Sequence, residues 1–265
     1  MKNVLVITGA AGGIAKEFLK LMKDEKGIDE IWALDIAAEK LDELKKIYGD
    51  KFIPIIVDVT KDEDLLAFQA KLEKEQPCVK WLINTAGTRA YYNKGATLPR
   101  QLLTVRTNLV GNMATCYACI PFMGKGSHIL NISSAASFQP LPSNNSYAAA
   151  KVGLRFFSKG LEYETKGSGI KITCACPGWV RTPLMQFASD EVKAIDRLPG
   201  AKDPDYIAKK CLKDARKGKS ICFPTLKVHI DYYITKYAPT AFVLFYAQHV
   251  ETDHYKDFKK LNILT

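Results

Sequence analysis

The chain has 265 residues, of which 47% are hydrophobic and 25% are charged, and it carries a formal net charge of +10 at pH 7. This length and composition predict one large folded domain and exclude a disordered chain. The Lys and Arg residues are spread along the sequence and often stand beside Asp or Glu, as in the segment 61–64. We therefore expect no nucleic-acid partner and interpret the excess charge as a solvated surface, with an anionic substrate or a membrane surface as the alternative.

Short buried strand patterns alternate with amphipathic helix patterns, and this alternation predicts an α/β fold. Strands are expected at residues 4–8, 30–35, 52–57, 79–84, 128–133, 170–176 and 220–223, and helices at 13–23, 39–48, 61–75, 98–121 and 147–165. Because helices separate the strands, we expect a doubly wound parallel sheet of about seven strands with helices on both faces. Residues 1–225 form this domain, and residues 226–265 are interpreted as an aromatic-rich C-terminal extension of it.

Two segments depart from the alternation. The segment 182–200 is punctuated by Pro and Gly, and we interpret it as a candidate mobile lid. The tail could close a lipophilic pocket, contact a membrane surface or form a subunit interface, because Tyr and Phe side chains serve all three purposes. Its aromatic residues include Tyr232, Tyr233, Tyr237, Phe242, Phe245 and Tyr246.

The sequence pattern favours a reducing, cytoplasmic location. No signal-peptide pattern precedes the first strand, and no apolar run approaches the roughly 20 residues of a membrane span. The seven cysteines are scattered, and Cys116 and Cys119 form a CxxC pair inside an apolar helical stretch with neither a second pair nor a nearby His. We therefore expect buried thiols, with no disulfide framework and no metal site.

A glycine-rich turn follows the first strand, in the sequence Thr8-Gly9-Ala10-Ala11-Gly12-Gly13-Ile14-Ala15. Glycine lets the backbone approach a pyrophosphate, and the N-terminus of the following helix supplies free N–H groups and a favourable dipole. The turn therefore predicts a dinucleotide cradle in a sheet of the Rossmann type, with close packing alone as the alternative.

A carboxylate at the end of the second strand favours NAD over NADP. Asp35 stands 22 positions after Gly13, where it can accept hydrogen bonds from the adenosine ribose and repel a 2′-phosphate. Neither Arg nor Lys occupies positions 9–15 or follows Asp35 directly. The alternative is that Asp35 is a surface carboxylate that caps the next helix.

Further strand ends are expected to meet the cofactor at the same crevice. Asp58-Val59 ends the third strand, where a side chain can reach the adenine. Asn84-Thr85-Ala86-Gly87 ends the fourth strand, where small residues leave room beside the ribose.

A Tyr–Lys pair and two polar residues are the candidates for chemistry. Tyr147 and Lys151 are four positions apart, so they share one helix face. An ammonium group beside a phenol favours the phenolate, which suits proton transfer to or from an alkoxide, although such pairs are also common on ordinary helices. Ser134 could stabilise developing charge on the substrate oxygen. Its neighbour Ser133 points the other way on a strand, and Asn108 could hold a water near Lys151.

These motifs, in this order and spacing, resemble those of the short-chain dehydrogenase/reductases over about residues 3–225. The resemblance implies a tetrad in which Tyr147 is the acid/base, Ser134 polarises the carbonyl, Lys151 binds the nicotinamide ribose and Asn108 holds a relay water. It also places Thr182 near the nicotinamide carboxamide. Ala15 and Thr85 depart from the family pattern only slightly. The expected cofactor-binding residues are Gly9, Ala11, Gly12, Gly13, Ile14, Asp35, Ile36, Asp58, Val59, Asn84, Ala86, Gly87, Tyr147, Lys151, Pro177, Gly178, Val180 and Thr182.

The expected substrate is a secondary alcohol or ketone. Its candidate lining is mostly apolar, which favours a hydroxysteroid, for example a bile acid, or a similar lipophilic compound; a small polar alcohol or sugar is the alternative. A non-catalytic NAD-binding regulator is a second class, disfavoured because all four tetrad positions are filled. The resemblance also implies a homodimer or homotetramer built through the helices that carry Asn108 and Tyr147. The lining candidates are Leu141, Asn144, Trp179, Leu184, Met185 and Phe187.

Overall fold

The structure is a computed structural model that describes residues 1–89, 97–141, 144–182, 200–239, 241–243 and 245. Within these residues, seven strands form one sheet in the order β3-β2-β1-β4-β5-β6-β7, and each neighbouring pair is parallel. The strands are β1 (Asn3–Thr8), β2 (Glu30–Asp35), β3 (Phe52–Ile56), β4 (Cys78–Asn84), β5 (His128–Ile132), β6 (Lys171–Ala175) and β7 (Ile221–Cys222). The predicted α/β class and doubly wound parallel sheet are therefore confirmed.

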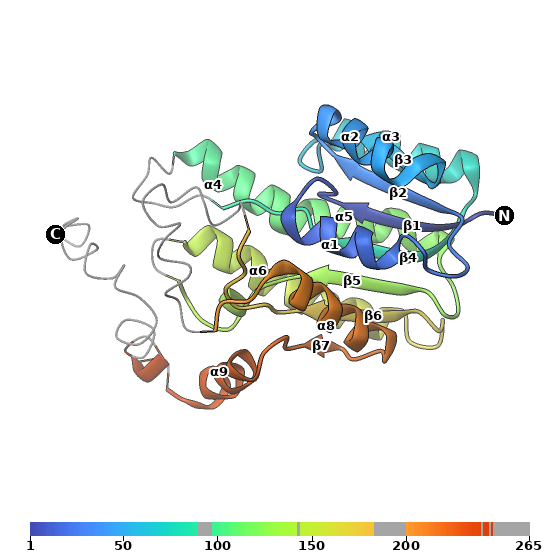
Figure 1. Cartoon of the computed structure of the whole chain (residues 1–265). Helices are drawn as coiled ribbons and strands as arrows, with labels where there is room; N and C mark the ends of the chain where they lie inside the picture. Colours follow the sequence, from blue (N-terminus) through green and yellow to red (C-terminus); the bar gives the residue numbers. More distant parts are fainter. Residues whose placement is uncertain (90–96, 142–143, 183–199, 240, 244, 246–265) are drawn as a thin grey trace.

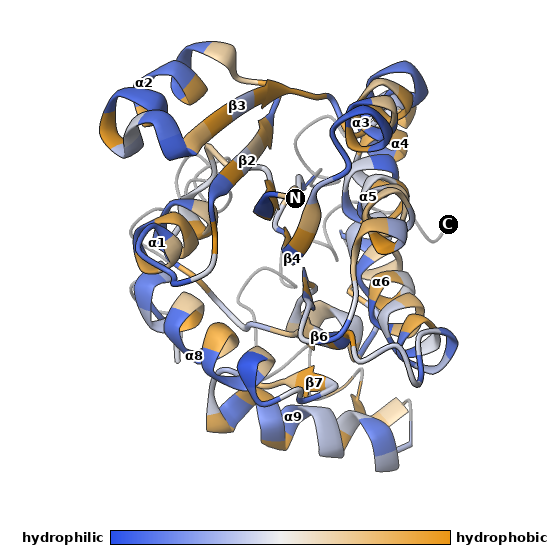
Figure 2. Cartoon of the chain, turned by 90° about the vertical axis from the view of Figure 1, so that its right-hand side faces the viewer, coloured by the Kyte–Doolittle hydropathy of each residue, from blue (hydrophilic) through white to orange (hydrophobic). Residues whose placement is uncertain are grey.

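Helices cover both faces of the sheet (Figure 2). One face carries α1 (Gly13–Met22), α2 (Ala38–Tyr48) and α8 (Pro204–Arg216), and the other carries α3 (Asp62–Glu75), α5 (Gly111–Cys119) and α6 (Asn145–Glu164). The helix α4 (Leu98–Val105) leads into α5, and α9 (Leu226–Tyr237) follows β7. This arrangement leaves the carboxyl ends of the strands at one edge, which is where open α/β sheets bind ligands.

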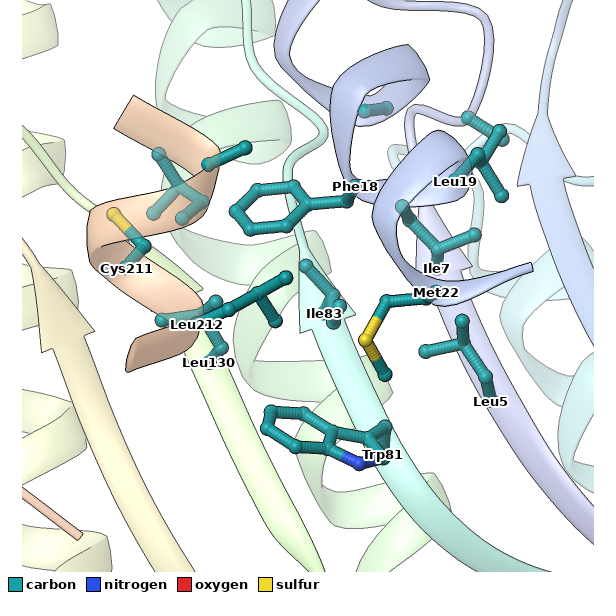
Figure 3. Close-up of a cluster of buried hydrophobic side chains, with 14 of the residues drawn as sticks. Leu5, Ile7, Phe18, Leu19, Met22, Trp81, Ile83, Leu130, Cys211 and Leu212 are labelled. Carbon is teal, nitrogen blue, oxygen red and sulfur yellow. The ribbon is translucent and has the colours of Figure 1, made fainter. Parts of the chain in front are cut away.

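Two hydrophobic clusters hold the layers together. Figure 3 shows the first, in which Phe18 of α1 and Leu212 of α8 pack over Ile83 and Leu130 of the sheet. The second joins the opposite sheet face to α3, α5 and α6, and it includes Phe68. Because parallel strands are covered on both faces, their sequences are almost continuously apolar, which is why the strand predictions agree with the structure to within one or two residues.

Three helical features differ from the predictions. The expected helix at 98–121 contains a π-helical segment, Arg106–Val110, between α4 and α5. The Asn108 and Asn112 side chains donate to the carbonyls of Thr104 and Thr107 in this region, so they compete with the regular backbone ladder. The helices α8 and α9 were not predicted, although Pro204 at the start of α8 and the basic residues in its last turn are ordinary helix signals.

Further expectations concern cysteine pairing, membrane spans, metal ligands and the candidate lid. All seven cysteines are free thiols; six of them are buried, and Cys78 is only partly buried. Among the described residues, neither a helix long and apolar enough to cross a membrane nor a cluster of potential metal ligands is found. The candidate lid at 182–200 lies almost entirely outside the described residues.

Candidate active site

The loops after β1 and β4 touch at the carboxyl edge of the sheet. Gly9 has a φ of +64°, and a Cβ atom built on it would lie 2.8 Å from the Cα of Ala86. The backbone N–H of Ala86 also donates to Thr8 Oγ1 at 3.2 Å. Only glycine combines this backbone angle with so close an approach, so Gly9 fixes the two loops that border the crevice.

The glycine turn leaves the N-terminus of α1 open. Gly12 is the N-cap of α1, no side chain caps the helix there, and its first turn contains no acidic residue. The amide groups of this turn can therefore bind an anion, and the helix dipole favours it. Ala11, Gly13 and Ile14 are partly exposed along the same turn and Gly12 is exposed, so the residues fit the predicted pyrophosphate cradle.

Asp35 joins the glycine turn to the start of α2. One carboxylate oxygen accepts a hydrogen bond from the Ala11 N–H and the other accepts one from the Ala37 N–H, both at 2.9 Å. Each oxygen keeps a lone pair for a further donor. The side chain is only partly buried and its neighbour Ile36 is exposed, so both are accessible at the carboxyl end of β2. Asp35 therefore also holds the backbone of Ala37, the residue that precedes α2.

The loop after β3 is held by its own carboxylates. Asp58 accepts hydrogen bonds from the N–H and the hydroxyl of Thr60, and its own N–H donates to Asp64. Val59 is buried, and a Cβ atom on Gly111 would lie 2.6 Å from the Val59 carbonyl oxygen. The glycine at the start of α5 therefore lets the loop after β3 pack directly against that helix.

Asn84 belongs to a buried polar network rather than to the crevice surface. Its side chain is fully buried, its Nδ2 donates to Asn131 Oδ1 at 2.9 Å, and its Oδ1 accepts from Thr115 Oγ1 at 2.8 Å. Asn131 in turn donates to Ser158 of α6. The network ties β4, β5, α5 and α6 together, so Asn84 is a positioning residue whose side chain is already occupied by protein partners.

Tyr147 and Lys151 lie together on α6, as their spacing predicts. The Lys151 ammonium lies 5.7 Å from the centre of the Tyr147 ring and donates to the Ile132 carbonyl at 2.8 Å. Burial lowers the pKa of Lys151 from its usual value, because the charged form is desolvated. The guanidinium of Arg89 lies 4.7 Å from the centre of the same ring. Two cations therefore flank the candidate acid/base.

Asn108 lies beside Lys151 across the Gly87 backbone. A Cβ atom on Gly87 would be 2.9 Å from Asn108 Oδ1 and 3.8 Å from Lys151 Nζ. The Asn108 Nδ2 donates to the Thr88 carbonyl at 2.6 Å, while Oδ1 is buried and has no hydrogen-bond partner among the described residues. A buried acceptor of this kind calls for a donor such as a water, which fits the predicted relay.

The two serines after β5 have different environments, as their opposite orientation predicts. Ser133 is buried and donates to the Lys151 carbonyl at 2.8 Å, so it holds α6 against the strand. Ser134 is partly exposed, and its Oγ accepts a hydrogen bond from the Ala136 N–H at 3.1 Å. That bond leaves the Ser134 hydroxyl proton to donate toward the crevice.

The segment after β6 lies beside the loop after β5 at the carboxyl edge of the sheet. The Pro177 carbonyl accepts from the Ala135 N–H at 2.8 Å, which joins the loops after β5 and β6. A Cβ atom on Gly178 would lie 3.0 Å from Val228 of α9. Val180 pairs with Lys202, and Thr182, the last described residue before the gap, is buried. The residues expected at the nicotinamide end therefore lie at the same sheet edge as Ser134.

The predicted substrate pocket is only partly described. Asn144 is the N-cap of α6, and its buried Oδ1 has no hydrogen-bond partner among the described residues. Its N–H donates to the Leu141 carbonyl at 2.9 Å, and Trp179 is partly exposed after β6. The remaining candidates, Leu184, Met185 and Phe187, lie outside the described residues.

Sequence reasoning missed Arg89. The residue follows Thr88 in the loop after β4, and Asn108 holds that loop through the Thr88 carbonyl. Its position two residues beyond Gly87 is the signal that could have found it, because the carboxyl ends of the strands converge on the crevice.

The comparisons with known proteins agree with this geometry. Residues 3–193 match the family model of the short chain dehydrogenases. This match covers more than half of the chain, so the protein belongs to the short-chain dehydrogenase/reductase family. The family match and the relatives described next show that it is an oxidoreductase of the class that acts on CH–OH groups.

Individual relatives show how far this similarity extends. The chain is 32% identical over 218 residues to an uncharacterized short-chain type dehydrogenase/reductase, y4vI, of Sinorhizobium fredii. The matched region covers 78% of this chain but only 39% of that longer protein. The chain is 30% identical over 213 residues to the 2-(R)-hydroxypropyl-CoM dehydrogenase of Xanthobacter autotrophicus, which covers 75% and 82% of the two chains.

A solved structure shares the fold over almost the whole chain. The short-chain dehydrogenase from Sphingobium yanoikuyae, in complex with NADPH, superposes with a TM-score of 0.74 at 22% identity, covering 96% of this chain and all of that chain. At this level of identity the likeness concerns the fold alone.

Proposed function

We propose that this protein is an NAD(H)-dependent oxidoreductase that moves a hydride between nicotinamide and a secondary alcohol or ketone, with Tyr147 as the acid/base. The observation that carries the proposal is the convergence of Tyr147, Lys151, Asn108 and the Gly87 backbone at the carboxyl edge of the sheet. Beside them, the open glycine turn fits a dinucleotide.

Four residues of the chain have separate roles in the proposed reaction. The Tyr147 phenol gives a proton to the carbonyl oxygen during reduction and takes it back during oxidation. The Ser134 hydroxyl donates to the same oxygen and stabilises its developing charge. The Lys151 ammonium group places a positive charge beside the phenol. Asn108 Oδ1 accepts a hydrogen bond from the water through which the proton reaches solvent. The nicotinamide, when bound, supplies or accepts the hydride.

The preference for NAD rests on Asp35. Its carboxylate stands at the adenosine end of the crevice with both oxygens fixed by backbone N–H groups, and a 2′-phosphate there would meet a negative charge. The short-chain dehydrogenase from Sphingobium yanoikuyae, which shares the fold at 22% identity, was solved with NADPH. The preference for NAD in this protein therefore rests on Asp35 alone, and the assay below includes both cofactors.

We favour a hydroxysteroid, for example a bile acid, or a similar lipophilic alcohol as the substrate. The predicted lining is largely apolar, with Asn144 offering a buried polar atom for orientation. The net charge of +10 is compatible with an acidic substrate. The free thiols accord with a reducing, cytoplasmic location.

We also propose a homodimer or homotetramer formed through α4, α5 and α6. These helices carry exposed apolar side chains, which a second copy would bury. Sedimentation velocity at micromolar concentrations should show an assembly larger than the 29.5 kDa monomer, whereas a monomeric boundary would contradict the proposal. The exposed residues are Leu98, Leu102, Leu103, Val110, Tyr117, Phe156 and Tyr163.

The proposed function is tested by following absorbance at the NADH band. Purified protein is mixed with NAD or NADP and a panel of steroids, bile acids, sugar alcohols and short aliphatic alcohols. We expect reduction of NAD with a steroid or bile acid and little reduction of NADP. Activity confined to NADP would overturn the role of Asp35, and turnover of sugar alcohols alone would overturn the lipophilic substrate.

A further inference from the structure

An apolar stripe runs along the outer face of α9. Leu226, Ile230, Tyr233 and Tyr237 are 73%, 50%, 47% and 72% exposed. At 3.6 residues per turn, these four positions fall within an arc of about 60°. Phe242, just beyond the helix, is also exposed. We call the four α9 residues the α9 stripe.

The opposite face of α9 is already packed against the domain. Val228 is buried against Gly178 in the loop after β6, and the centre of the Tyr232 ring lies 5.1 Å from that of Phe138 in the loop after β5. Thr225 caps the helix by accepting from the Val228 N–H. The helix is therefore fixed in orientation against the loops after β5 and β6 and lies beyond β7 (Figure 1). Its exposed apolar outer face is a property of the folded protein.

Lysines flank the α9 stripe on both sides. Viewed down the axis of α9, Lys227 is rotated about 100° from Leu226 in one direction, and Lys236 is rotated about 80° from Leu226 in the other. Lys227 is paired with Asp231, and the Lys236 ammonium lies 5.1 Å from the centre of the Tyr237 ring. An apolar face rich in tyrosine and bordered by lysines has the composition of a helix that lies in the interface of a lipid bilayer.

The size of the α9 stripe argues against a second copy of the chain as its occupant. Twelve residues span about 18 Å, and a helix about 10 Å wide offers a footprint of about 200 Å². A stable protein interface needs about 800 Å² from each partner. A lipid surface needs only an apolar face and basic flanks, and the net charge of +10 adds attraction to anionic lipid.

We propose that α9 docks the protein on the surface of an anionic membrane, with the α9 stripe inserted among the lipid headgroups. This surface borders the loops that carry Ser134 and Gly178, so a lipophilic alcohol dissolved in the membrane would lie close to the mouth of the crevice. The docking does not depend on the proposed turnover.

The test is sedimentation of the full chain with vesicles made of equal parts phosphatidylcholine and phosphatidylglycerol, without cofactor or substrate. The wild type should bind these vesicles, bind vesicles of phosphatidylcholine alone more weakly, and lose affinity as salt is raised. The variant Leu226→Ser/Ile230→Ser should lose about tenfold or more in partition coefficient, because two aliphatic side chains no longer enter the lipid. The matched control, Ile47→Ser/Leu66→Ser, removes exposed aliphatic residues from α2 and α3 and should bind like the wild type.

Three outcomes would overturn the proposal. The wild type could fail to bind either vesicle, the control could lose as much affinity as the α9 variant, or sedimentation velocity could show that the α9 variant abolishes a dimer, which would assign the α9 stripe to a second copy. Circular dichroism confirms that each variant is folded. Because binding is measured without turnover, failure here would leave the oxidoreductase assay unaffected.

Discussion

Asp35 illustrates how one side chain combines structure with selectivity. Its two oxygens accept from Ala11 in the glycine turn and from Ala37 before α2, so they hold the cradle in shape even without a ligand. The same charge stands where the adenosine ribose is expected. Replacing Asp35 should therefore change both the choice of cofactor and the free energy of unfolding, and each change can be measured separately.

The variant Asp35→Ser should reduce the ratio of kcat/KM for NAD to that for NADP by about tenfold or more, because the negative charge facing a 2′-phosphate is removed. Losing two charge-assisted hydrogen bonds should also lower the free energy of unfolding by about 1–3 kcal/mol. Steady-state kinetics and urea unfolding provide the measurements. The exposed Asp42→Ser on α2 is the control, and an unchanged cofactor ratio in Asp35→Ser would refute the selector role.

At the scale of elements, the turn between β1 and α1 depends on its contact with the loop after β4. The positive φ of Gly9 and its approach to Ala86 are separate constraints on the same residue. Gly27 also has a positive φ, of +80°, but a Cβ atom there would meet nothing within 4 Å. Comparing substitutions at the two glycines therefore separates the effect of the backbone angle from the effect of the steric contact with Ala86.

Gly9→Ala should lower the free energy of unfolding by about 2–4 kcal/mol and weaken NADH binding, because the new methyl group pushes the two crevice loops apart. Gly27→Ala should lower the stability by only about 1 kcal/mol and leave NADH binding intact. Urea unfolding and the fluorescence of bound NADH measure these effects. Equal losses of stability in the two variants would mean that the Ala86 contact is unimportant.

Much of the sheet could be predicted from the sequence, because buried parallel strands are short apolar runs bounded by turns. The spacing of Tyr147 and Lys151 also placed them on one face of α6, since the helical period is local. The role of Asn84 could not be predicted, because its partners Thr115 and Asn131 come from distant parts of the chain. The same reason explains why the position of Arg89 over the Tyr147 ring was missed.

At the scale of the whole molecule, buried thiols link stability to pH. Complete burial raises the pKa of Cys116 to about 12, above its ordinary value of 9.0, and burial raises the pKa of Cys119 as well. The folded protein keeps these protons to higher pH than the unfolded chain. Their contribution to stability is therefore fully present below pH 9 and is lost as the pH rises toward 12.

Between pH 7.5 and pH 10, the free energy of unfolding of the wild type should fall, and the fall in Cys116→Ala should be smaller by about 1–2 kcal/mol. Urea unfolding at the two pH values measures this difference. Cys78→Ala removes a thiol that is only partly buried and should behave like the wild type. If Cys116→Ala shows the same fall as the wild type, burial of this thiol does not govern the pH dependence.

The most direct test of the central claim is Tyr147→Phe, compared with Tyr163→Phe, which makes the same change at an exposed position of α6. We measure NADH binding by fluorescence and turnover with the best alcohol found in the panel. Tyr147→Phe should bind NADH like the wild type while its kcat falls by about 10²-fold or more, because the proton donor is gone and the ring remains. Tyr163→Phe should retain both. Full turnover in Tyr147→Phe would contradict the proposed mechanism.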